Sequence, residues 1–113
     1  MPMINLTTSA AIDAPAAEKL KAGLGRAIPL LPGKSESLLM ISLRGNTPMY
    51  FHGEALDLAF VEVNCFGHLP SAAYEKLTGA VTELLGDVLA IKPENVFIKY
   101  FETDNWGWNG RNL

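Results

Sequence analysis

The sequence predicts an α+β (α/β) fold in which two tandem β-α-β units merge into a four-stranded mixed sheet with both helices on one face. Two observations predict it. Four apolar runs of strand length alternate with two segments of helical periodicity. The apolar stripe of the first helical segment recurs 57 residues later, and a Lys-x-Glu-x segment recurs 58 residues after its first copy. Right-handed crossovers then make the two strands of each unit parallel.

The first unit is expected to begin and end with a strand. Residues 2–7 alternate as a strand, with Ile4 and Leu6 on one face. Residues 38–44 form the second strand, and its clean apolar face consists of Leu39, Ile41 and Leu43. Residues 45–48, Gly-Asn-Thr-Pro, are typical of a turn.

A helix is expected between these strands. It starts at about Pro15, since proline suits a first helical turn, and Asp13 can cap it. Its apolar positions follow helical spacing, and they are Leu20, Leu24, Ala27, Ile28 and Leu31. Pro29 lies inside this stripe and removes a backbone hydrogen bond, so the helix is expected to kink or end early there.

The second unit repeats the pattern. Residues 57–64 form an apolar strand interrupted by Glu62, and residues 71–89 form a helix. The stripe of that helix consists of Leu77, Val81, Leu84, Leu85 and Val88. Residues 96–102 form the last strand, and residues 105–113 form a polar-aromatic tail.

The strands carry apolar side chains on both of their faces. Leu38 and Met40 alternate with Leu39 and Ile41, and Leu58 and Phe60 alternate with Ala59, Val61 and Val63. The helices cover one face, and a bare second face would expose an apolar patch larger than monomers usually show. Other copies of the same sheet are expected to cover it in a closed, symmetric oligomer.

Length and composition favour one domain that spans residues 1–113. Hydrophobic residues make up 49% of the chain and charged residues 19%, which excludes a disordered or highly solvated segment. The net charge is -3, and no basic cluster is present to neutralise phosphates. A nucleic-acid partner is therefore not expected.

The sequence favours a cytoplasmic protein, or one exported without a signal peptide. The start of the chain has neither a positive region nor a long apolar segment, so it does not resemble a secretion signal. No apolar run approaches the roughly 20 residues that cross a bilayer, so no membrane association is expected. Cys65 is the single cysteine, which excludes an internal disulfide and a C-x-x-C redox pair.

Common catalytic motifs are absent. His52 and His68 have no metal-ligand spacing to each other or to Cys65, and neither a phosphate-binding loop nor a G-x-S-x-G elbow occurs. Cys65 is interpreted as a small buried hydrophobe at a strand end rather than as a nucleophile. Neither a metal nor a cofactor is expected.

The amino terminus offers different chemistry. Proline at position 2 favours removal of Met1, and the new terminus is then a secondary amine. A free α-amino group titrates near 7.7–8.0, and an apolar pocket beside a lysine would lower its pKa further, which makes it a base at neutral pH. By itself, Pro2 carries no such implication, because proline is common at this position.

Further motifs accompany Pro2 in a fixed order along the chain. They are Pro2-Met3-Ile4, Gly33-Lys34, Gly67 after a strand, Ile91-Lys92-Pro93-Glu94-Asn95-Val96 and Gly107-Trp108-Asn109. Together with the tandem units, they resemble the macrophage migration inhibitory factor family of the tautomerase superfamily over essentially the whole chain. The segment 47–53 resembles microbial and protozoan members more than the vertebrate cytokine.

The resemblance implies a homotrimer with three active sites at subunit boundaries. It implies a cofactor-independent keto–enol tautomerase of the phenylpyruvate tautomerase or L-dopachrome isomerase type, acting on small aromatic α-keto acids. Pro2 is then the base, Lys34 meets the substrate carboxylate, and Phe66 supplies a backbone donor and an apolar wall. The remaining pocket residues implied are Phe97 and Lys99, from the neighbouring subunit, and Trp106 and Trp108.

Two positions and one segment depart from the vertebrate cytokine. Phe97 replaces a tyrosine, so a phenolic donor is missing, and Lys99 replaces an asparagine, which adds a cation. Residues 58–61 replace a C-x-x-C segment, so no thiol–disulfide activity is implied.

Two other function classes remain open from the residues. One is a cytokine-like or host-interacting trimeric binding protein with a vestigial pocket; the sequence identifies no receptor. The other is a regulatory domain of the ferredoxin-like type, which shares the split β-α-β pattern but has no need of Pro2 at the terminus.

Overall fold

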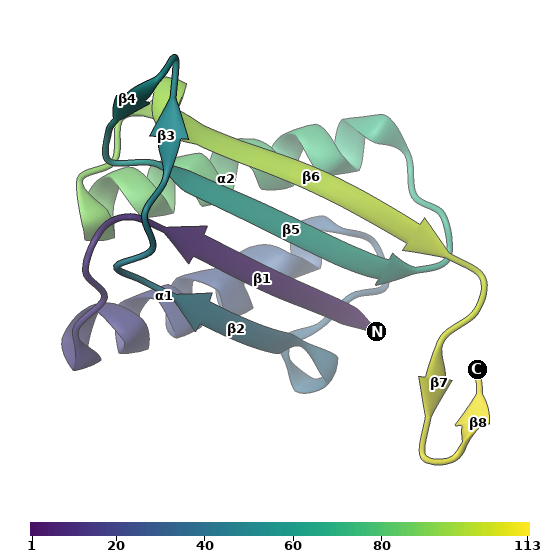
Figure 1. The fold of residues 1–113 in the computed structure, drawn as a ribbon. Coiled ribbons are helices and arrows are strands. Elements are labelled where there is room, and N and C mark those ends of the chain that lie inside the picture. The colour runs from purple at the N-terminus through teal and green to yellow at the C-terminus, as the bar shows by residue number, and fades with distance from the viewer.

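A computed structural model describes residues 1–113 as a four-stranded mixed sheet backed by two helices (Figure 1). The sheet strands are β1 (Pro2–Thr8), β2 (Met40–Arg44), β5 (Ala59–Phe66) and β6 (Val96–Thr103), and the helices are α1 (Ala14–Ala27) and α2 (Ser71–Leu89). The strand order is β2-β1-β5-β6, with β1 parallel to β2, β5 parallel to β6, and β1 antiparallel to β5. The predicted pair of β-α-β units and their mixed sheet are therefore confirmed.

Two short hairpins extend beyond the sheet. They are formed by β3 (Tyr50–Phe51) with β4 (Glu54–Ala55), and by β7 (Gly107–Trp108) with β8 (Arg111–Asn112). The second hairpin lies in the segment predicted only as a polar-aromatic tail. Neither helix is both long and apolar enough to cross a membrane.

The helix α1 has the predicted ends. The Asp13 side chain accepts a hydrogen bond of 2.8 Å from the amide of Ala16, and Pro15 lies in the first turn. The α-helix stops at Ala27, and a 3-10 turn at Ile28–Leu30 follows it. Because proline has no amide hydrogen, Pro29 ends the regular α-helical ladder, as predicted.

The core lies between the helices and one face of the sheet. It contains the predicted strand residues Ile4 and Leu6 and most of both helical stripes, namely Leu20, Leu24, Ile28, Leu31, Leu77, Val81 and Leu85. Ala27, Leu84 and Val88 from those stripes are half-buried and pack against this cluster. The cores of the two units merge across α1 and α2, which lie side by side behind the sheet.

The second strand starts later than predicted. The chain forms a 3-10 turn at Glu36–Leu38, and β2 begins only at Met40. Leu38 is 46% exposed in that turn, and Leu58, expected on the open face of the next strand, is buried just before β5. Neither residue belongs to the face that the helices leave open.

That open face carries apolar side chains towards its ends and is polar across its middle. The register aligns Phe60 and Phe97 with Thr7 and Arg44 in one row, and Met40 and Met3 with Asn64 and Phe101 in another. Between these rows, Ser42, Asn5, Glu62 and Lys99 are aligned across the sheet. Phe60 and Phe97 are 38% and 37% exposed and Met40 is 58% exposed, so the apolar surface expected on this face is present but divided.

Candidate active site

The amino terminus lies where β5 and β6 end and where the last segment of the chain leaves the sheet (Figure 1). Pro2 is the first residue of β1 and pairs with Cys65 of β5, which in turn pairs with Glu102 of β6. Pro2 is buried and shares the helix-facing side of β1 with Ile4. The start of the chain is thus fixed by sheet pairing at the edge of the core.

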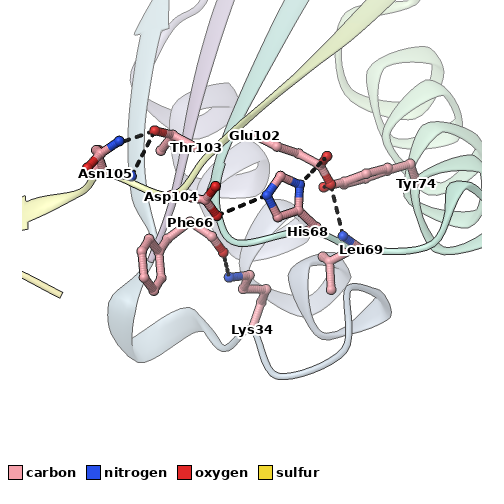
Figure 2. Close-up of polar contacts among 9 residues, drawn as sticks. All are labelled: Lys34, Phe66, His68, Leu69, Tyr74, Glu102, Thr103, Asp104 and Asn105. Carbon is pink, nitrogen blue, oxygen red and sulfur yellow. Dashed lines mark hydrogen bonds and ion pairs between the residues drawn. The ribbon is translucent and has the colours of Figure 1, made fainter.

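Lys34 and Phe66 form a polar contact beside this terminus (Figure 2). The ammonium group of Lys34 donates a hydrogen bond of 2.8 Å to the carbonyl oxygen of Phe66. The amide of Phe66 donates a hydrogen bond of 3.2 Å to the carbonyl oxygen of Met1. Of the residues predicted for the site, the structure therefore brings together Pro2, Lys34 and Phe66.

The position of Lys34 depends on the turn after the first helix. The amide of Leu31 donates to the carbonyl of Ile28, and the amide of Lys34 donates to the carbonyl of Leu31 at 3.1 Å. Gly33 has a φ of 78°, a conformation that glycine adopts without steric cost. This turn carries the chain from the end of the helix to the edge of the sheet at Phe66.

The environment of the terminus disfavours positive charge. Burial lowers the pKa of the Met1 amino group, and the charge of the neighbouring Lys34 lowers it further. An amine in these surroundings holds its proton less tightly than a free terminus. It therefore stays neutral, and available as a base, at a lower pH than an exposed α-amine does.

Cys65 lies beside this terminus but has the properties of a core residue. It is 1% exposed, and burial raises the pKa of its thiol. A protonated, inaccessible thiol is a poor nucleophile. The interpretation of Cys65 as a small buried hydrophobe is confirmed.

Phe97 and Lys99 lie away from Pro2 in the same chain. Phe97 is near the start of β6, next to Phe60, and its ring meets that of Phe51 edge-on with 5.0 Å between centroids. Lys99 lies in the middle of the open face, with its ammonium nitrogen 4.8 Å from the ring centroid of Phe101. Both side chains are exposed, so they are available to a second chain rather than to Pro2 of their own.

The two tryptophans belong to the segment that follows the sheet. Trp106 is half-buried, and Trp108 in β7 is 55% exposed. The segment starts at the same end of the sheet as Pro2 and forms the hairpin β7–β8 (Figure 1). The structure shows no hydrogen bond between either tryptophan and Pro2, Lys34 or Phe66.

A cluster of polar side chains next to this terminus was not identified from the sequence (Figure 2). The Nδ1 atom of His68 lies 3.1 Å from Oε1 of Glu102, and its Nε2 atom lies 2.9 Å from Oδ1 of Asp104. The other carboxylate oxygen of Glu102 accepts hydrogen bonds of 2.9 Å from the amide of Leu69 and 2.6 Å from the hydroxyl of Tyr74.

These contacts change the acidity of the groups that make them. The hydrogen bonds from Tyr74, Leu69 and His68 lower the pKa of Glu102 to about 2. Hydrogen bonds to Glu102 and Asp104 raise the pKa of His68. Burial and then the bond to Glu102 raise the pKa of the Tyr74 hydroxyl. The cluster thus combines an ionised carboxylate with a histidine that favours its protonated form.

This cluster leaves no local pattern in the sequence. The partners of His68 lie 34 and 36 residues further along the chain, and only the pairing of β5 with β6 brings them close. Only a pattern that spans two strands indicates the contact: Glu102 and Asp104 flank the end of the last strand, and His68 follows the end of the strand before it. No group of three or more His, Cys, Asp or Glu side chains is arranged to hold a metal ion.

Comparisons with known proteins agree with this geometry. A family model described as macrophage migration inhibitory factor (MIF) matches residues 1–113. MIF2 from Leishmania major has a solved structure that is similar with a TM-score of 0.93 and 26% identity, over 100% of this chain and 97% of that one. The macrophage migration inhibitory factor homologue of Prochlorococcus marinus gives 0.85 and 29%, over 97% of both chains.

More distant structures share the fold. The MIF-like protein of Entamoeba histolytica has a TM-score of 0.87 at 19% identity, over 99% of this chain and 98% of that one. A search among curated protein sequences finds no match.

Proposed function

Because the chain belongs to the macrophage migration inhibitory factor family, we propose that it is a cofactor-independent keto–enol tautomerase of small aromatic α-keto acids. Phenylpyruvate is the model substrate, and isomerisation of a dopachrome-type compound is the same chemistry. The base is the secondary amine of Pro2, which removal of Met1 sets free. The protein acts as a homotrimer, in which each site is completed by a neighbouring chain.

The observation that carries this proposal is the position of the terminus beside Lys34 and Phe66. Burial and the charge of Lys34 lower the pKa of the terminal amine in the chain that still has Met1. When Met1 is removed, the nitrogen of Pro2 becomes the terminus, at the first residue of β1. The same surroundings then favour its neutral, basic form.

Phe66 offers a donor for the reaction. Its amide donates to the carbonyl of Met1 at 3.2 Å, so removal of Met1 leaves this N–H without that acceptor. The donor then lies next to Pro2, where an oxygen of the substrate can accept it. A backbone donor fixed by a strand requires no reorganisation when negative charge develops on that oxygen.

Lys34 is proposed to bind the substrate carboxylate, and Pro2 to transfer the proton. The Lys34 ammonium, held by the Phe66 carbonyl at 2.8 Å, attracts the carboxylate of the α-keto acid. The Pro2 nitrogen removes the proton from the carbon next to the keto group, and the electron pair of that C–H bond forms the enolate. The protonated Pro2 then returns the proton to the enolate oxygen, so the enzyme leaves the cycle unchanged.

Phe97 and Lys99 are proposed to complete the site from a neighbouring subunit. They lie on the open face, away from Pro2 of their own chain, and both are exposed. Trp106 and Trp108 are proposed to add an apolar wall at the end where the chain leaves the sheet. The aromatic wall suits the ring of an aromatic keto acid, and the second cation, Lys99, suits its carboxylate.

The test is the fate of activity when the Pro2 nitrogen is altered. Intact mass shows whether Met1 is absent, and phenylpyruvate tautomerisation is followed by ultraviolet absorbance. Pro2→Gly is expected to reduce kcat/KM by about 10²-fold or more, because general-base catalysis contributes on that scale. Fold and oligomeric state are expected to stay as in the unaltered protein.

A second variant separates the amine from the side chain. One alanine placed ahead of Pro2 converts its nitrogen into an amide and leaves every side chain in place. It is expected to reduce activity as much as Pro2→Gly does. A protein with this blocked terminus that still acts on phenylpyruvate at the unaltered rate would show that the base lies elsewhere.

A further inference from the structure

The last segment of the chain is attached to the body of the protein through few polar contacts. We call residues 105–113 the C-terminal arm. The amide of Gly67 donates to the carbonyl of Thr103 at 2.8 Å, where β6 ends. The next contact is the ion pair between His68 and Asp104, at 2.9 Å (Figure 2). Asp104 is therefore the root of the arm.

Beyond that root, the arm forms hydrogen bonds only with itself and with the end of β6. The amide of Asn105 donates to the Thr103 hydroxyl at 3.0 Å, and the amide of Leu113 donates to the carbonyl of Trp106 at 2.9 Å. The hairpin of the arm stands away from the sheet in Figure 1. Within one chain, the direction of the arm is consequently set close to Asp104.

The contacts of His68 require its protonated form. Carboxylate oxygens only accept hydrogen bonds, and both nitrogens of His68 face such oxygens, at 3.1 Å and 2.9 Å. Both nitrogens must therefore carry a hydrogen, which is the imidazolium ion. The groups that face the ring are Glu102 and Asp104 from the end of β6 and, behind Glu102, Tyr74 of α2 and the buried Cys65 of β5.

The two carboxylates differ in how much they depend on His68. Glu102 keeps the hydrogen bonds from Leu69 and Tyr74 when His68 is neutral or absent. Asp104 accepts no hydrogen bond other than the one from His68. Loss of the imidazolium charge therefore weakens mainly the contact at the root of the arm.

We propose that protonated His68 is a positioning residue that holds the root of the C-terminal arm through Asp104 and so fixes where Trp106 and Trp108 are presented. The relevance of this position to substrate rests on the proposed function, whereas the coupling of His68 to the arm does not. The raised pKa of His68 means that the contact is complete below the ordinary pKa of histidine and is lost as the pH rises through the raised value.

The chain offers a direct readout of the arm. Its two tryptophans, Trp106 and Trp108, both lie in the arm, so tryptophan fluorescence reports on that segment alone. Quenching by acrylamide is measured between pH 5 and 9 in the unaltered protein. The ratio of detached to attached arm is expected to rise by roughly two- to five-fold across the titration of His68, the range that an exposed ion pair supports. The quenching constant is expected to rise with it, mainly through the half-buried Trp106.

Variants test whether His68 causes the change. His68→Gln and Asp104→Asn are each expected to give the high quenching constant at every pH, and the double variant to differ little from either. The other histidine provides the control, since His52→Gln is expected to keep the pH dependence of the unaltered protein. Quenching that is the same in all five proteins, the unaltered one and the four variants, would overturn the proposal.

Proton NMR of the imidazole signals supplies the second measurement. In His52→Gln the single remaining histidine is expected to titrate with a midpoint above 6.5, and adding Asp104→Asn is expected to lower that midpoint. An unchanged midpoint would show that Asp104 does not contact His68 in solution. Both measurements are made without substrate, so they stand or fall separately from the tautomerase assay with Pro2 variants.

Discussion

Phe66 contributes to the proposed site through its main chain. Its carbonyl accepts from Lys34 and its amide donates to Met1, so one residue orients the cation and supplies the donor. Both groups lie at the end of β5, where Phe66 pairs with Thr103 of β6. The side chain at this position can therefore change the wall of the pocket without moving the polar groups.

Lys34 gives the first prediction at this scale. Lys34→Ala is expected to raise the KM for phenylpyruvate by roughly 10–100-fold, because a charge-assisted hydrogen bond to the carboxylate is lost. An uncharged ester analogue is expected to change much less. Steady-state kinetics with both substrates measure the difference.

The internal repeat supplies a matched control for Lys34. Lys92 occupies the corresponding position of the second unit, is exposed and has no terminal proline near it in sequence. Lys92→Ala is expected to leave both substrates unaffected. Equal losses for the acid and the ester in Lys34→Ala would remove Lys34 from the proposed carboxylate contact.

Single residues also mark the limit of what sequence can predict. Pro2 and Lys34 were identified because motifs accompany them, and the structure brings them to one end of the sheet. His68 was not identified, since a salt bridge across 36 residues has no local pattern. Contacts of this kind depend on sheet register, which the sequence specifies only through the alternation of buried residues.

At the scale of elements, the sequence predicted the helices better than the strand starts. Capping by Asp13 and the early end at Pro29 leave local signals, and both were found. The predicted start of β2 is two residues early, because Leu38 and Leu39 extend its apolar run, whereas Leu38 belongs to the 3-10 turn Glu36–Leu38. Leu38 has no strand partner in the register of β1 with β2.

The turn that presents Lys34 gives the second prediction. Gly33 has a φ of 78° and open space around its α-carbon, so the only cost of a side chain there is conformational. Gly33→Ala is expected to lower the free energy of unfolding by about 1–2 kcal/mol, since other residues resist this conformation. It is also expected to raise the KM for phenylpyruvate, because Lys34 follows directly.

The control is a glycine that differs only in backbone conformation. Gly79 lies within α2, also has open space around it and has an ordinary φ. Gly79→Ala is expected to raise the free energy of unfolding by about 0.5–1 kcal/mol, because alanine favours helices. Urea denaturation measures both variants, and a stabilising Gly33→Ala would contradict the role assigned to this turn.

At the scale of the molecule, the repeat was sufficient to predict the architecture. Two similar units with parallel strand pairs can merge into one sheet, and the order β2-β1-β5-β6 is what the structure has. The sequence predicts an apolar patch on the open face, and the structure shows that Asn5, Glu62 and Lys99 divide this patch across its middle. The alternation of apolar and polar residues shows which residues of one strand share a face. It does not show which residues of neighbouring strands lie opposite one another.

This divided face has a consequence for the proposed trimer. Phe60 and Phe97 at one end, and Met40 and Phe101 at the other, offer apolar contacts to neighbouring copies. Lys99 stands in the polar row between them, on the same strand as Phe97. A neighbouring subunit that packs on this face can therefore reach both residues that the proposed site takes from a second chain.

The last prediction tests this sharing of sites by mixing two inactive variants. Pro2→Gly lacks the base, and Lys99→Glu places a negative charge where the substrate carboxylate is expected. If Pro2 and Lys99 of one site come from different chains, random assembly leaves both residues intact in about one quarter of all sites in the mixture. Refolding a 1:1 mixture is expected to restore about that share of the unaltered activity.

Mixing Pro2→Gly with Lys34→Ala is expected to restore none, because Pro2 and Lys34 meet at the end of a single chain. Restoration in both mixtures, or in neither, would show that the site is not divided between chains in this way.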